Sequence, residues 1–283
     1  MTQLSYDNTF EGLLTAVFEI YEFKYPSPNI SKHDDTQQNL FADILVVSTN
    51  VSKSDRVVKK LQTQIGTDGV RCLIWAFLSE KIGVENIIFN VINYAVQNPT
   101  VNIMKDFSND SVLQISQLTK NVGREKHRME AFIRFEQLKD GIYFAKIDPD
   151  FDVLTLLIKH FKNRYQDQKW IIYDLRRKYG VYYDLNEVEI ITMDLDLKSL
   201  DDKSNQVFSD TEIDYQKLWW EYFDHTNIKE RKNTKLHIQH VPKRYWKYLT
   251  EKKMFWKRSF YSRYKTGVRQ HCKFLIFLSA KQI

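Results

Sequence analysis

The chain has 283 residues, of which 43% are hydrophobic, and a formal net charge of +6 at pH 7. This length and composition are enough to bury a hydrophobic core, which excludes an intrinsically disordered chain and a small disulfide-framework protein. No apolar run approaches the roughly 18 residues of a membrane span, and residues 1–8 lack the features of a signal peptide. The two cysteines, Cys72 and Cys272, are isolated in the sequence, as is typical of a reducing compartment. We therefore expect a cytoplasmic protein that does not contact a membrane.

Periodic apolar residues predict a mostly helical N-terminal half. Helical intervals recur in residues 10–21, 57–65, 70–82, 87–95 and 112–122. Short strands are expected at residues 4–6 and 44–48, and the polar stretch 29–39 predicts a loop.

The pattern changes after residue 130 to short alternating segments. Strands are expected at residues 131–137, 141–147, 170–174, 181–184 and 188–193, with a helix at 154–165. Asp140 and Gly141 form a hairpin signal between the first two strands. Together these segments predict an α+β protein with a helical N-terminal half and a largely antiparallel sheet flanked by helices.

The chain is expected to divide into a core, a connection and a C-terminal part. Residues 1–193 predict the helical and antiparallel-sheet core, 194–208 a linker or loop, 209–251 a helical segment packed on the core, and 252–283 a basic extension. Ser209 and Glu212 have the spacing of a capping box. The helix that follows is expected to bury a stripe made of Tyr215, Leu218, Trp219, Tyr222 and Phe223.

Positive charge is concentrated at the C-terminal end. Residues 229–283 contain 16 lysine and arginine residues and two glutamates, a net charge of +14, so residues 1–228 carry −8. A clustered positive field attracts polyanions and is typical of nucleic-acid-binding proteins. A basic tail that only aids solubility is the alternative.

The sequence contains none of the common nucleotide- or metal-binding motifs. It has no phosphate-binding loop, no dinucleotide-binding glycine pattern, no nucleophile elbow and no cysteine–histidine zinc spacing. His237 and His240 have no third ligand nearby. We therefore predict no cofactor and no metal.

The first of three polar clusters lies near residue 124. It comprises Arg124, His127 and Arg128, followed by Arg134. In a continuous helix the first three lie on one side at i, i+3 and i+4, where two guanidinium groups and an imidazole suit a phosphate. A solvated helix end is the alternative.

The second cluster lies in the turn between two predicted strands and comprises Asp174, Arg176 and Arg177. A carboxylate beside two arginines forms either a structural ion-pair corner or a base that positions water, because the arginines hold it ionised. Asp174 and His127 of the first cluster are the two candidates for catalytic residues.

The third cluster interleaves cations with aromatic rings. Its members are Lys235, Gln239, His240, Lys243, Arg244, Tyr245, Trp246 and Lys247. Cations along a backbone together with aromatic faces are what binding of single-stranded nucleic acid requires. The alternative is that the rings dock the chain end onto the core while the lysines face water.

Three segments, 122–135, 173–184 and 239–249, resemble an uncharacterised bacterial family labelled probable DNA metabolism protein. The opening residues 6–18 fit the same pattern, and the resemblance covers residues 4–251. The resemblance implies that the protein acts on DNA together with a radical-SAM DNA-modification or repair protein. It also implies that in some relatives a similar domain is joined to a uracil-DNA glycosylase-like domain. It implies no catalytic residues, and residues 252–283, which hold about half of the C-terminal basic residues, extend beyond the family pattern.

Three hypotheses follow. The first is a DNA-binding accessory subunit that presents nucleic acid to a partner enzyme. The second is an enzyme that itself excises bases or cleaves phosphodiesters in damaged or modified DNA, using Asp174 or His127. The third is a protein-interaction scaffold in which Tyr245 and Trp246 bind the partner.

Overall fold

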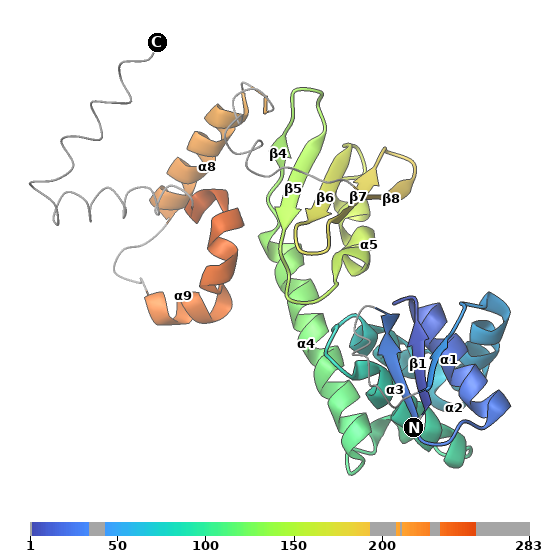
Figure 1. Ribbon diagram of the computed structural model, residues 1–283. Helices are drawn as coiled ribbons and strands as arrows, with labels where there is room; N and C mark the ends of the chain where they lie inside the picture. Colours follow the sequence, from blue (N-terminus) through green and yellow to red (C-terminus); the bar gives the residue numbers. More distant parts are fainter. Residues whose placement is uncertain (1, 34–42, 193–207, 210, 227–232, 253–283) are drawn as a thin grey trace, which may run out of the picture. The chain divides into compact units, whose positions relative to one another are not determined.

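The computed structural model describes residues 2–33, 43–192, 208–209, 211–226 and 233–252. Its elements follow in the order β1 (Thr2–Tyr6), α1 (Phe10–Phe23), β2 (Pro28–Lys32), β3 (Asp43–Val46), α2 (Val51–Phe77), α3 (Val84–Gln97), η2 (Ile103–Lys105), α4 (Asp110–Phe132), β4 (Glu136–Gln137), β5 (Tyr143–Ile147), α5 (Leu154–Arg164), β6 (Trp170–Asp174), β7 (Tyr179–Tyr183), β8 (Val188–Thr192), α8 (Glu212–Thr226), α9 (Thr234–His240) and η4 (Lys243–Tyr248). The predicted mixture of helices and sheets, an α+β fold, is confirmed (Figure 1).

The chain divides into two compact units, residues 1–127 with 149–155 and residues 128–148 with 156–283. The linker and the extension that the sequence predicts, 194–208 and 252–283, lie almost entirely outside the described residues. Across the described ranges, no helix has the length and apolar character that crossing a membrane requires.

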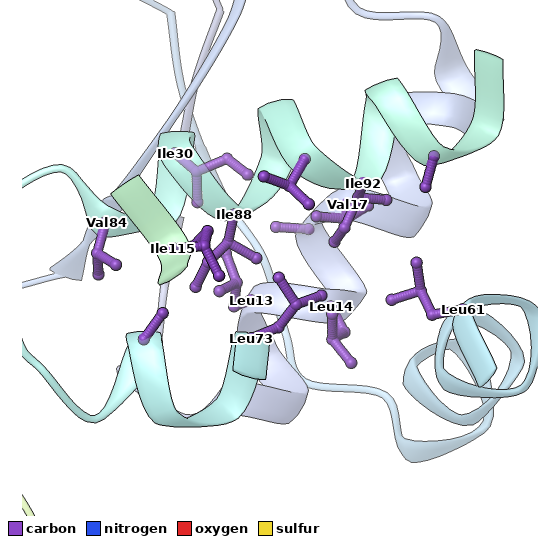
Figure 2. Close-up of a cluster of buried hydrophobic side chains, with 14 of the residues drawn as sticks. Leu13, Leu14, Val17, Ile30, Leu61, Leu73, Val84, Ile88, Ile92 and Ile115 are labelled. Carbon is purple, nitrogen blue, oxygen red and sulfur yellow. The ribbon is translucent and has the colours of Figure 1, made fainter. Parts of the chain in front are cut away.

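The first unit is built on a three-stranded parallel sheet in the order β2-β1-β3. Leu4 and Tyr6 of β1 are buried with side chains of α1, α2 and α3, and the Tyr6 hydroxyl donates to Glu85 of α3 at 3.2 Å. Figure 2 shows this core, whose labelled members are Leu13, Leu14, Val17, Ile30, Leu61, Leu73, Val84, Ile88, Ile92 and Ile115. Burying these side chains is the main stabilising contribution to the unit.

Strand β2 overlaps the start of the predicted loop 29–39, so that prediction is wrong for residues 29–32. Only Ile30 of this strand is fully buried, because its neighbours are polar. The side chain of Asn86 on α3 bonds both the N–H and the carbonyl of Ile30, each at 3.0 Å. Pairing with β1 and this amide satisfy the backbone of β2, which therefore needs no alternating apolar pattern.

The second unit contains a five-stranded sheet in the order β4-β5-β6-β7-β8. Three of its four strand pairs are antiparallel, as expected, and only β5 and β6 are parallel. Helix α5 connects these two strands and packs on the sheet through Phe161, whose ring lies 6.3 Å from that of Trp170. The hairpin predicted at Gly141 is present, with a positive φ of 85° at that glycine. The strand predicted at 131–137 is mostly wrong, because α4 continues to Phe132.

Helix α8 begins where the sequence predicts a helix, but it differs in two respects. Glu212 forms no capping box, because its carboxylate accepts the backbone N–H of Gln137 on β4 at 3.0 Å. The stripe predicted to be buried is exposed at each position whose side chain is described: Tyr215, Leu218, Trp219 and Tyr222. Helical periodicity identifies an apolar face but does not determine whether another element covers it.

Candidate functional site

The parallel strands β5 and β6 end side by side. Ile147 of β5 is in register with Asp174 of β6, and the N–H of Leu175 donates to the Ile147 carbonyl at 2.9 Å. Asp148 follows β5 directly, so the two carboxylates lie at the same edge of the sheet. The carboxyl ends of parallel strands are the usual location of ligand sites in open sheets.

Asp174 organises the turn between β6 and β7. Its Oδ1 accepts the backbone N–H groups of Arg176 and Arg177 at 2.9 and 3.1 Å, and its Oδ2 pairs with Nη1 of Arg177 at 2.8 Å. The side chain of Asp174 is 0% exposed and that of Arg177 is 10% exposed. This geometry is that of a structural ion-pair corner, and it leaves no exposed carboxylate atom to meet a substrate.

Asp148 draws together three groups from two distant parts of the sequence. Its carboxylate lies 3.6 Å from Nε of Arg176 and 3.1 Å from Nζ of Lys247, and it accepts the Tyr248 hydroxyl at 3.3 Å. We call these four residues the edge cluster. The side chains of Arg176 and Lys247 are 52% and 60% exposed, whereas that of Asp148 is 29% exposed. Two accessible cations therefore surround one carboxylate.

Lys247 remains charged within the edge cluster. Partial burial by itself would lower the pKa of Lys247, but its contacts with Tyr248 and Asp148 outweigh that effect and raise the pKa. Burial also raises the pKa of Tyr248, which keeps its hydroxyl proton available as a donor.

The aromatic rings of η4 hold this segment on the second unit. Tyr245 is 2% exposed and its ring lies 5.4 Å from that of Phe132, while Nε1 of Trp246 donates to the Val241 carbonyl at 2.9 Å. Lys243, Arg244 and Lys247 are exposed, and the Arg244 guanidinium donates to the Tyr245 hydroxyl. The arrangement of Tyr245 corresponds to the docking alternative, in which the rings face the core and the cations face water.

Glu251 anchors the end of the described chain. Its carboxylate pairs with Arg134 at 3.0 Å and accepts the indole N–H of Trp219 at 3.3 Å. Burial alone would raise the pKa of Glu251, but the charge of Arg134 and the hydrogen bonds from Arg134 and Trp219 lower it below the usual 4.5. Arg134, predicted to bind phosphate, thus has a structural partner.

Glu251→Gln should lower the free energy of unfolding by about 1–3 kcal/mol at pH 7, because Arg134 loses its charged partner. A carboxyl with a lowered pKa in the folded state stabilises the fold above about pH 4.5, and this contribution is lost as the pH falls through the folded-state pKa. Urea unfolding at pH 7 and pH 3.5 should therefore show a smaller acid-induced loss for the variant than for the wild type. Equal losses would contradict the assignment.

The model of one protein family, described as a domain of unknown function (DUF4130), matches residues 83–251. The chain belongs to this family. Searches of curated proteins and of solved structures returned no match. The DUF4130 match includes β5, β6 and η4, so the whole edge cluster lies within the family domain.

The boundary between the two units falls within the first predicted cluster, between His127 and Arg128 of α4. The helix continues to Phe132, so Arg124, His127 and Arg128 do share one side, but the first two belong to the first unit and Arg128 to the second. Arg124 donates to the Asn121 side chain at 3.1 Å, and His127 is exposed.

The residues predicted on α9, Lys235, Gln239 and His240, are all exposed. His237 packs against Trp246. Burial lowers the pKa of His237, and the positive charge of Lys252 lowers it further. Among the described residues of the DUF4130 chain, no group of three or more His, Cys, Asp or Glu side chains could hold a metal ion.

Asp148 is a site residue that the sequence motifs did not identify. It directly follows the strand expected at residues 141–147 and precedes Pro149, and no motif marks it. The signal that could have identified it is its position directly after a strand that pairs in parallel with the strand ending at Asp174.

Proposed function

We propose that this DUF4130 protein is a nucleic-acid-binding accessory subunit of DNA metabolism or repair, acting in the cytoplasm. In this proposal it presents DNA to a partner enzyme of the radical-SAM or glycosylase type. The single observation that carries the DNA-binding part is the edge cluster, in which the exposed cations Arg176 and Lys247 meet beside Asp148. The family resemblance of the sequence supports the choice of partner.

The edge cluster suits a phosphate group better than a neutral ligand. Its two cations outnumber its single carboxylate, and Lys243 and Arg244 add exposed positive charge on the same short helix. Residues three apart are eclipsed in a 3₁₀ helix, so Arg244 and Lys247 lie on one face. Guanidinium and ammonium groups neutralise phosphates and release counterions, which supplies most of sequence-independent affinity.

Tyr245 is buried, so its ring is not accessible for stacking on a nucleic-acid base. We therefore propose contact with the phosphate backbone, with little dependence on base sequence. Burial of Asp174 gives little support to an enzyme that uses this carboxylate, and burial of Tyr245 gives little support to a scaffold that presents this ring to a partner.

A salt series tests the proposal. The full chain should bind labelled single- or double-stranded DNA with a log K that falls linearly with log salt, at a slope of about −4 if roughly five phosphates are contacted. Fluorescence anisotropy measures this slope directly. Absence of binding at low salt, or a slope near zero, would reject the proposal.

A further inference from the structure

Helix α8 presents an exposed, largely aromatic face. The exposed fractions of Tyr215, Leu218, Trp219 and Tyr222 are 64%, 67%, 42% and 60%. Their spacing of i, i+3, i+4 and i+7 places them on one side of the helix, and the rings of Trp219 and Tyr222 stack at 5.7 Å. A contiguous exposed apolar face is typical of an interaction surface.

The last described residues of the chain lie beside this face. The indole N–H of Trp219 donates to Glu251, which is itself buried and paired with Arg134. Residue 253 therefore follows by two positions Glu251, which is hydrogen-bonded to Trp219 of α8. The segment 253–283 has 31 residues, and fewer than about ten extended residues would span the roughly 22 Å of a 15-residue helix.

The chemistry of this segment complements the face. Residues 253–283 contain eight lysine and arginine residues and no aspartate or glutamate, whereas Asp214 and Glu221 are exposed on α8. The segment also carries apolar groups, namely Phe255, Trp256, Phe260 and the run of residues 274–278.

Other occupants fit less well. A nucleic acid would bring phosphates close to Asp214 and Glu221, and a second copy docked through its own α8 would bring the same carboxylates together. We propose that residues 253–283 of the same chain dock on the α8 face, with apolar side chains over Tyr215, Leu218 and Trp219 and cations beside Asp214 and Glu221. This inference does not depend on DNA binding, and the segment lies beyond the DUF4130 match, which ends at Glu251.

Photo-crosslinking of the full chain tests the docking. A benzoylphenylalanine at Leu218 should crosslink to residues 253–283 of the same molecule, identified by mass spectrometry. The matched control position is Ile190 on β8, which is 65% exposed and should give little crosslinking to this segment. A mixture of nitrogen-15-labelled and unlabelled chains separates intramolecular from intermolecular products. Products between two chains, or no product with residues 253–283, would overturn the proposal.

Limited trypsin digestion provides a second measurement that does not depend on the crosslinker. Leu218→Ser should speed cleavage within residues 253–283 about tenfold, because it removes the apolar contact that docking would make and adds no charge. Ile190→Ser should leave the rate unchanged, and circular dichroism verifies that both variants are folded. Equal cleavage rates in the wild type and in Leu218→Ser would count against docking.

Discussion

Replacing Lys243, Arg244 and Lys247 together with alanine is expected to weaken DNA binding by the full chain on the order of a hundredfold or more at 0.1 M salt. Each phosphate contact contributes about −0.9 to the slope of log K against log salt, so the loss of three should reduce the slope by about 2.7. The difference between the wild type and the variant should therefore shrink toward 1 M salt. Anisotropy titrations across a salt series measure both quantities.

A matched control removes the same charge elsewhere. Lys59 and Lys60 on α2 and Lys120 on α4 are exposed lysines of the first unit, and their triple alanine variant should retain most of the affinity. Equal losses in the two triple variants would mean that net charge, and not the η4 surface, determines binding. Intact binding after the η4 substitutions would remove the proposed interface.

Asp174→Ala is expected to lower the free energy of unfolding by about 3–5 kcal/mol. The substitution removes the carboxylate that lies 2.8 Å from Nη1 of Arg177, whose side chain is 10% exposed. It also removes the acceptor of two backbone N–H groups in the β6–β7 turn. Urea unfolding followed by tryptophan fluorescence measures the loss, because Trp170 lies on β6.

Two further variants separate charge from geometry. Asp174→Asn keeps an oxygen that can accept the N–H groups of the turn, so it should lose less stability than Asp174→Ala. Asp148→Ala removes a carboxylate whose charged partners are exposed, so it should lower the free energy of unfolding by less than about 1 kcal/mol. An Asp174→Ala protein as stable as the wild type would contradict the structural role of this carboxylate.

Elements determined by local pattern were predicted well. The short apolar and aromatic run of residues 170–174 identified β6 with both of its ends, and Asp140-Gly141 located the hairpin before β5. Helical intervals identified α1, α3 and α5 because one face of each helix packs in a core. Strand β2 could not be found in this way, because it contributes one buried apolar side chain, Ile30.

Predictions that required knowledge of distant partners were incomplete. The apolar face of α8 was correctly located but wrongly expected to be buried, because periodicity does not identify a covering element. The cations of η4 were named from their density in the sequence. Their meeting with Arg176 at Asp148 was not foreseen, since it depends on segments about 70 and 100 residues apart.

The sequence by itself determined the α+β class, most helices and strands, and the concentration of positive charge toward the C-terminus. Those properties depend on composition and on contacts between residues close in the chain. Only the tertiary structure decided that Tyr245 faces the core while Lys247 faces solvent, and that Asp148 and Asp174 lie at the ends of adjacent strands. Parallel pairing of β5 with β6 and the packing of η4 decide these positions, because both bring together residues that no local period connects.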